Sequence, residues 1–186
     1  MLGTFQDNGG PTKTYLPLAG SPAIDGGSSE GISPIDQRGV QRPQDDPWTL
    51  NANSGDGTEI GAVELKVPKA SIGDVSLTEG IEGTTDATFT VKLTEPEVSA
   101  KTLGVHYVTQ NDEAISPADY SSASGTLEFA SRGEALSKTI TVAVQTDAVD
   151  EPIEGFFVDL GGSEPEYIAD GSALAIIRDD DPPPCQ

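Results

Sequence analysis

The sequence predicts an all-β protein whose larger part is a seven-stranded antiparallel β-sandwich. The 186 residues include 21 Gly and 14 Pro, and only 5% are aromatic; this composition favours short strands and turns over long helices. From residue 68 onward, apolar runs of strand length recur between turn residues, as in all-β domains. Several of these runs alternate apolar with polar residues, which indicates strands with one buried and one exposed face.

The seven strands are expected at residues 72–77, 87–94, 102–109, 125–130, 138–145, 155–160 and 173–177. Alternation is clearest in the second, where Ala87, Phe89, Val91 and Leu93 share one face. It recurs in the fifth with Ile140, Val142 and Val144, and in the sixth with Phe156, Val158 and Leu160. We expect these faces to form the core between two packed sheets.

A change in composition near residue 68 divides the chain. Residues 1–67 contain many Gly and Pro turn pairs and few apolar runs, whereas residues 68–181 hold all the expected strands. Residues 182–186 follow as a Pro-rich tail or linker. The first segment is poor in apolar residues and cannot bury much apolar surface by itself.

The formal charge of −21 limits the partners of the chain. Nucleic acid and anionic membrane surfaces are met by Lys and Arg, so binding to either is not expected. No run approaches the roughly 20 apolar residues that span a bilayer, so membrane insertion is not expected either. The first residues lack the charged and apolar regions of a secretion signal. If the protein is extracellular, its export signal is expected upstream of this segment.

The order of the strands predicts where the acidic residues meet. In a sandwich of seven alternating strands, the first, third and fifth connections lie at the same pole as the end of the last strand. These four segments contain Glu79, Glu82, Asp86, Asp112, Glu113, Asp119, Asp147, Asp150, Glu151, Glu154, Asp179, Asp180 and Asp181. The opposite pole receives Glu95, Glu97, Glu134, Glu164 and Glu166. Solubility alone does not require this asymmetry.

Carboxylates that converge in this way suit calcium, which takes six to eight oxygen ligands in flexible geometry. Magnesium demands more rigid octahedral geometry and keeps its waters. Zinc and copper prefer His or Cys, and the single His, His106, falls in the third expected strand, where it is expected to be exposed. The alternative is that the acids form a solvated charged rim, which is the simpler interpretation for any one of them.

Residues from about 70 to 181 resemble a Calx-β domain. The resemblance is carried by segments in the order and spacing of the family: 75–80 (VSLTEG), 87–93 (ATFTVKL), 117–120 (PADY), 124–129 (SGTLEF), 138–142 (KTITV), 149–156 (VDEPIEGF) and 177–181 (IRDDD). It implies an immunoglobulin-like, calcium-binding β-sandwich, as used in sodium–calcium exchangers, integrin β4 and many bacterial surface proteins.

The same resemblance implies a ligand set. Carried over by position, the calcium ligands fall on Glu79, Asp119, Asp147, Glu151, Glu154, Asp179, Asp180 and Asp181. The sequence departs from the family where Thr146 and Ala148 flank Asp147 in place of consecutive Asp residues. It departs again at 111–114, which read NDEA in place of DGTA. With fewer carboxylates than a full cluster, one or two calcium ions are expected.

Residues 1–67 resemble the C-terminal end of a bacterial right-handed parallel β-helix of the choice-of-anchor type. The matching segments are 2–3 (LG), 6–12 (QDNGGPT), 20–25 (GSPAID), 36–39 (DQRG), 42–43 (RP) and 60–64 (IGAVE). The resemblance implies a secreted or surface-attached protein. Asp25, Asp36 and Arg38 are expected to form turns and local pairs and not to be catalytic.

The leading hypothesis is a non-enzymatic, calcium-binding module of a bacterial secreted or cell-surface protein, acting in adhesion or as a calcium-rigidified spacer. Surface carbohydrates or proteins are further expected partners of the parent protein. One alternative is an accessory region of a β-helix carbohydrate-active enzyme, although the sequence shows no Ser/His/Asp set and contains a single Trp. Another is a structural spacer that does not depend on calcium.

Overall fold

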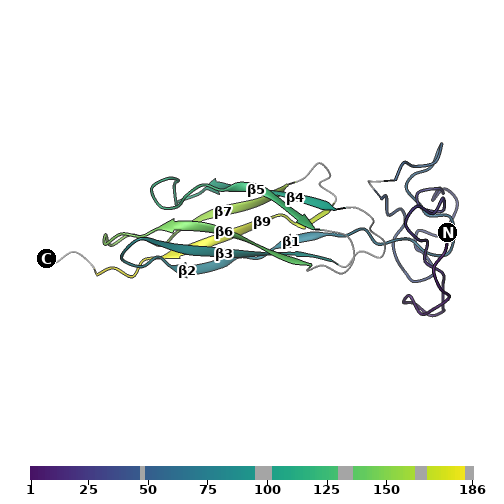
Figure 1. The fold of residues 1–186 in the computed structure, drawn as a ribbon, viewed down its shortest axis with the longest axis horizontal. Helices are drawn as coiled ribbons and strands as arrows, with labels where there is room; N and C mark the ends of the chain where they lie inside the picture. Colours follow the sequence, from purple (N-terminus) through teal and green to yellow (C-terminus); the bar gives the residue numbers. More distant parts are fainter. Residues whose placement is uncertain (47–48, 95–101, 130–135, 162–166, 183–186) are drawn as a thin grey trace. The chain divides into compact units, whose positions relative to one another are not determined.

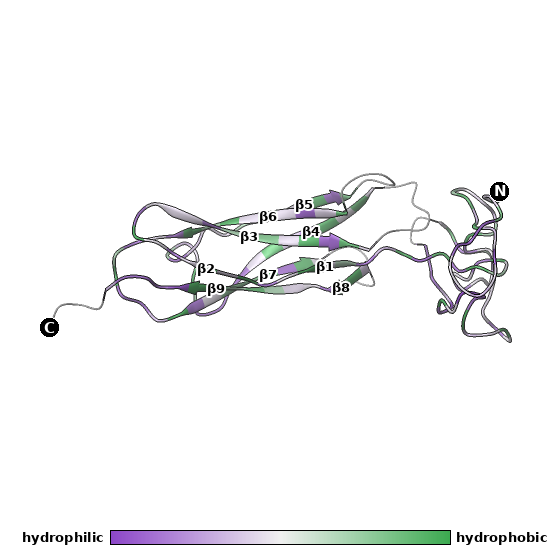
Figure 2. Cartoon of the chain, turned by 90° about the horizontal axis from the view of Figure 1, so that it is seen from below, coloured by the Kyte–Doolittle hydropathy of each residue, from purple (hydrophilic) through white to green (hydrophobic). Residues whose placement is uncertain are grey.

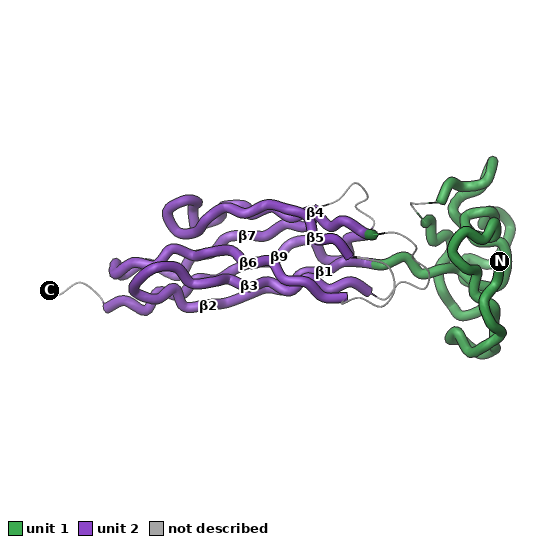
Figure 3. Tube along the Cα trace, viewed as in Figure 1, with its two compact units in different colours: residues 1–68, 95–102, 130–134 green, residues 69–94, 103–129, 135–186 purple. Residues whose placement is uncertain are grey.

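A computed structural model describes residues 1–46, 49–94, 102–129, 136–161 and 167–182 (Figure 1). The chain divides into two compact units, one containing Met1–Pro68 and the other Lys69–Thr94, Leu103–Phe129 and Ala135–Gln186 (Figure 3). Among the described residues, no helix is both long enough and apolar enough to span a bilayer. The five acids predicted for the opposite pole lie outside the described residues: Glu95, Glu97, Glu134, Glu164 and Glu166.

The second unit is a sandwich of two β-sheets, which confirms the predicted all-β fold (Figure 1). Its strands are β1 (Ala70–Ile72), β2 (Val75–Thr78), β3 (Thr84–Leu93), β4 (Leu103–Asn111), β5 (Ser124–Phe129), β6 (Ser137–Gln145), β7 (Glu154–Gly161), β8 (Ile168–Asp170) and β9 (Ser172–Arg178). One sheet has the order β6-β3-β1-β8 and the other the order β2-β9-β7-β4-β5. The described residues thus form nine strands where seven are predicted.

The prediction of a single strand over residues 72–77 is wrong. The chain changes sheets at Gly73 and Asp74, so that β1 pairs with β3 in one sheet and β2 pairs with β9 in the other. The Asp74 carboxylate accepts a hydrogen bond from the Leu174 backbone N–H at 2.9 Å and fixes the crossing point. The added strand β8 has only three residues, which are too few to show an alternating pattern.

The prediction of a fully antiparallel sandwich is also wrong, because two of the strand pairings are parallel. They are β1 with β8 and β2 with β9, and the other pairings are antiparallel. After the change of sheets, β2 runs in the same direction as the last strand and takes the edge beside it. The β2–β9 register aligns Thr78 with Arg178 and therefore sets the two chain segments that follow these strands next to each other.

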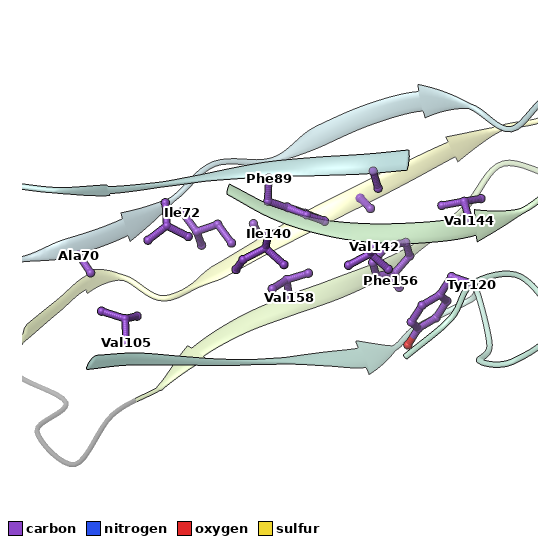
Figure 4. Close-up of a cluster of buried hydrophobic side chains, with 14 of the residues drawn as sticks. Ala70, Ile72, Phe89, Val105, Tyr120, Ile140, Val142, Val144, Phe156 and Val158 are labelled. Carbon is purple, nitrogen blue, oxygen red and sulfur yellow. The ribbon is translucent and has the colours of Figure 1, made fainter. Parts of the chain in front are cut away.

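The core lies between the two sheets and is formed by the predicted alternating faces (Figure 4). Phe89 and Val91 of β3 and Ile140 of β6 are fully buried, as are Phe156 and Val158 of β7. Their polar neighbours along each strand face outward, and Figure 2 shows hydrophobic and hydrophilic residues interspersed along the strands. Burial of one face and hydration of the other holds the register of each strand, because a shift of one residue would exchange the faces.

Gly155 in β7 is required by close packing. A Cβ atom at this position would lie 2.6 Å from the carbonyl oxygen of Ala175 in the neighbouring strand β9. We expect Gly155→Ala to lower the free energy of unfolding by about 1–3 kcal/mol, because the backbone must move to relieve the overlap. Chemical denaturation measures this loss. The matched control is Gly161→Ala at the other end of β7, where a Cβ meets nothing within 4 Å; an equal loss in both variants would contradict the packing argument.

The first unit has little apolar core. Its buried hydrophobic residues are Ile24, Val63 and Leu65, whereas Thr14, Ser21, Asp25, Asp36, Thr58, Glu59 and Glu64 are buried polar residues. Isolated antiparallel bridges link Leu2 with Pro17, Gln6 with Thr14, and Ile35 with Gln41. The polar composition predicted for this segment therefore extends into its interior, where hydrogen bonds and ion pairs take the place of apolar packing.

The local roles predicted for the charged residues of the first unit are confirmed. The Arg38 guanidinium pairs with the Asp36 carboxylate at 3.0 Å, and this carboxylate also accepts the backbone N–H groups of Arg38, Val40 and Glu64. Burial raises the pKa of Asp36, but these hydrogen bonds outweigh it and hold the pKa below its ordinary value. Asp25 occupies a turn with a positive φ of 50°.

Candidate metal centre

Two clusters of carboxylates lie at the pole of the sandwich where β2 and β9 end. In the Glu79 cluster, Glu79, Asp179 and Asp181 each place one carboxylate oxygen within 4.8 Å of the others. In the Glu154 cluster, Asp119, Glu151 and Glu154 do the same. Six of the eight predicted ligands are therefore brought together, and they come from four segments of the chain that are distant in sequence.

The Glu79 cluster follows from the parallel pairing of β2 with β9. Glu79 directly follows β2, and its backbone N–H donates to the Arg178 carbonyl at 3.0 Å, which continues the ladder by one residue. Asp179 directly follows Arg178 on the adjacent strand. The sheet thus holds two carboxylates side by side, although charge repulsion opposes this placement.

Two oxygens of the Glu79 cluster are buried and lack a hydrogen-bond partner. Glu79 is 4% exposed and Asp181 is 8% exposed. Oδ1 of Asp179 and Oδ2 of Asp181 are buried without a hydrogen-bond partner. Burial, followed by the charges of Glu151 and Asp179, raises the pKa of Glu79 to about 7. Buried acceptors without donors are costly, so this cluster lacks a positive partner.

The Glu154 cluster is half-buried: Glu154 is the first residue of β7, Glu151 lies in the β6–β7 connection, and Asp119 lies in the β4–β5 connection. Oδ2 of Asp119 accepts the backbone N–H of Ile115 at 2.6 Å, which fixes its position in the β4–β5 connection. Burial and then the charge of Asp119 raise the pKa of Glu154 to about 7. Burial and then the charge of Asp147 also raise the pKa of Glu151.

Asp147 and Asp180, the remaining predicted ligands, belong to neither cluster. Oδ1 of Asp147 accepts the Val149 N–H at 2.8 Å, and Oδ1 of Asp180 accepts the Gly80 N–H at 3.0 Å. The charge of Asp147 nevertheless contributes to the raised pKa values of both Glu79 and Glu151. Asp147 therefore acts electrostatically on a member of each cluster. Asp180 instead holds the β2–β3 connection against the segment after β9.

The structure adds contacts to residues that the sequence did not propose as ligands. The hydroxyl of Thr85 donates to the carbonyl oxygen of Glu79, and Thr146 buries a hydroxyl without a partner beside Asp147. Oδ1 of Asn111 accepts the Tyr120 hydroxyl at 2.6 Å and so supports the segment that carries Asp119. The two hydrogen bonds join residues six and nine positions apart, and the sequence pattern alone does not show that they form. His106 is exposed, as predicted, and its Nδ1 lies 2.7 Å from the Thr126 hydroxyl.

The donor set of both clusters fits a hard cation. All six members are carboxylates, which are the ligands that calcium prefers, and neither cluster contains His or Cys. A cation would also supply the partner that the buried oxygens of Asp179 and Asp181 lack. The residues present therefore meet the chemical requirements of a calcium site.

The match to a known family agrees with this geometry. The model of the Calx-beta domain family matches residues 62–181. The chain belongs to this family. A Calx-beta domain is a binding domain and not a catalytic one, which is consistent with the expectation that this part of the protein is not an enzyme.

Solved structures share the fold of this Calx-beta domain. The CBD12 fragment from CALX1.2 is 21% identical with a TM-score of 0.52, and the match covers 61% of this chain and 46% of that one. The apo-form CBD1 domain of Calx is 22% identical with a TM-score of 0.52, and the match covers 61% of this chain and 98% of that domain. The calcium-binding domain CBD12 of CALX1.1 is 22% identical with a TM-score of 0.50, and the match covers 61% of this chain and 46% of that one. The chain thus spans less than half of each CBD12 fragment. No curated protein matches the chain.

Proposed function

We propose that the sandwich binds calcium through the carboxylates at this pole and acts as a calcium-rigidified module. The ligands are Glu79, Asp119, Asp147, Glu151, Glu154, Asp179, Asp180 and Asp181. The observation that carries the proposal is the Glu79 cluster, in which buried carboxylate oxygens have no hydrogen-bond partner. Two solved structures of similar fold support it, since one is the calcium-binding domain CBD12 of CALX1.1 and the other is the apo form of the Calx CBD1 domain.

Calcium binding would change the mechanics of this pole. Without a cation, the β2–β3, β4–β5 and β6–β7 connections and the segment after β9 carry like charges that repel one another. A shared cation would neutralise this repulsion and tie the four segments together. The module would then transmit force or hold its orientation better with calcium than without it.

We further propose that the module belongs to a bacterial secreted or cell-surface protein, where it acts in adhesion or as a spacer. This setting rests on the resemblance of residues 1–67 to the last coils of a parallel β-helix, followed by the sandwich over 68–181 and a linker over 182–186. Millimolar calcium is available outside cells, and modules of this kind bind it with a Kd of about 10⁻⁴–10⁻³ M. Contacts with surface carbohydrates or proteins would be made by the parent protein.

Titration of the full chain with calcium tests the proposed function. We expect binding heat in calorimetry and a rise in the melting temperature, because calcium at 100 times its Kd stabilises a one-site protein by about 2.7 kcal/mol. Magnesium at the same concentration is the control and should have a smaller effect, since it requires stricter octahedral geometry. Absence of binding heat, together with unchanged melting and protease resistance, would favour a spacer that does not depend on calcium.

A further inference from the structure

A second group of buried acids lies in the first unit, which contains none of the candidate calcium ligands. Glu59 is 2% exposed, and Asp25 and Glu64 are fully buried. Both carboxyl oxygens of Glu59 and Oδ2 of Asp25 are buried without a hydrogen-bond partner. An isolated carboxylate in such a place is strongly disfavoured, so a positive partner or a proton is needed.

The arginines of this unit are engaged with other groups. Arg42 pairs with Oε2 of Glu64 at 2.6 Å and also donates to the backbone carbonyl of Gly61. Arg38 pairs with Asp36 and donates to the backbone carbonyls of Asn8 and Glu64. These ion pairs neutralise Asp36 and Glu64, whereas the carboxyl group of Glu59 forms no ion pair among the described residues.

The side chain of Glu59 instead meets another acid. The Glu64 carboxylate lies close enough to raise the pKa of Glu59, and a hydrogen bond between the two carboxyl groups can form only when Glu59 carries a proton. Oε1 of Glu64 already accepts the backbone N–H groups of Gln44 and Glu59, at 3.1 and 3.4 Å. Because Arg42 and these backbone donors already engage the Glu64 carboxylate, a proton shared by the two acids belongs on Glu59.

The remaining charges around the pair favour protonation. Asp25 adds a negative charge near Glu59, and Asp45 and Asp46 add theirs near Asp25. The Leu65 backbone N–H lowers the pKa of Glu59, but less than burial and the neighbouring acids raise it. Among the described residues, three acids gather within 4.8 Å only in the two clusters of the sandwich, so a proton fits here better than a metal ion.

We propose that the first unit folds around a proton held between the Glu59 and Glu64 carboxyl groups, and that it loosens as the solution becomes alkaline. The Glu59 O–H donates to a Glu64 carboxylate oxygen, whose charge Arg42 balances. Loss of this proton would leave two adjacent buried carboxylates facing a single guanidinium. The first unit would then respond to pH independently of calcium binding by the sandwich.

The sign of the pH dependence follows from linkage. Burial and the neighbouring Glu64 hold the pKa of Glu59 well above its ordinary value, and burial raises the pKa of Asp25 to about 7. The folded state therefore keeps protons that the unfolded chain loses above about pH 4. The stability that these protons contribute is greatest below that pH and decreases as the pH rises, with the unfolding constant growing about tenfold per pH unit for each retained proton. Above pH 7, where Asp25 has ionised, only the Glu59 proton contributes to the pH dependence of unfolding of the first unit.

The test follows unfolding of the full chain by the fluorescence of Trp48, its only Trp, which lies within the sequence of the first unit. Glu59→Gln keeps a donor toward Glu64 but cannot ionise, so its unfolding constant should vary about tenfold less per pH unit than that of the wild type. Glu30→Gln, which changes an exposed acid of the same unit, should retain the wild-type slope. Equal slopes in the wild type and Glu59→Gln would overturn the proposal.

A direct measurement keeps the proposal testable if Glu59→Gln does not fold. Carbon NMR of Glu side chains in the wild type should show one protonated carboxyl at about pH 8.5, where Glu79 and Glu154 have ionised. No protonated Glu at that pH would overturn the proposal. Deprotonation of this carboxyl on addition of calcium would place a cation at Glu59 and would also overturn it.

Discussion

Replacing Asp179 and Asp181 together by Asn is expected to stabilise the calcium-free sandwich and to remove most of its stabilisation by calcium. Both expected effects follow from the Glu79 cluster, where three carboxylates lie together and two buried oxygens lack hydrogen-bond partners. Without calcium, the double variant relieves repulsion on Glu79, whose pKa is raised by burial and by its acidic neighbours. With calcium, two charged ligands are missing. Melting curves with calcium and with chelator measure both effects.

The affinity of the double variant should be lower than that of the wild type by at least tenfold in Kd, or about 1.4 kcal/mol. Asp112→Asn is the matched control, since it removes an exposed acid from the same pole that belongs to neither cluster. The control should bind calcium as the wild type does. If both variants respond to calcium equally, the acids form only a charged rim. If the double variant is less stable than the wild type without calcium, the carboxylates are structural and not repulsive.

Much of the fold could be predicted because alternation reports burial directly. Phe89 and Val91 face the core from β3, and Ile140 and Val142 face it from β6, as the sequence pattern indicates. The change of sheets at Gly73 and Asp74 could not be predicted in this way. A period of two shows which residues face inward, but it does not show which of the two packed sheets carries the strand.

The convergence of acids at one pole could be anticipated from the order of the strands, whereas their division into two clusters could not. That division depends on the register of β2 against β9, which sets Glu79 beside Asp179. It depends also on local backbone contacts that engage Asp147 and Asp180. Both are tertiary features, and position in the sequence alone treats all eight acids as equivalent ligands.

The aromatic core behind the Glu154 cluster should be essential for both stability and calcium binding. The Phe156 ring stacks on Tyr120 with ring centres 4.1 Å apart and meets Phe89 edge-on at 6.1 Å. Phe156 is fully buried. We expect Phe156→Ala to lower the free energy of unfolding by about 3–5 kcal/mol, through lost transfer energy and the cavity that remains. Denaturant unfolding in the absence of calcium measures this loss.

The same substitution should weaken calcium binding, because the stack positions two members of the Glu154 cluster. Tyr120 directly follows Asp119, and Phe156 lies two residues beyond Glu154 on β7. A cavity in place of the ring lets both backbone segments shift, and preorganised ligands bind more tightly than mobile ones. Phe157→Ala is the matched control, because the adjacent ring on the opposite face of β7 is only half-buried. Equal losses of stability and affinity in the two variants would show that the buried stack has no special role in holding the site.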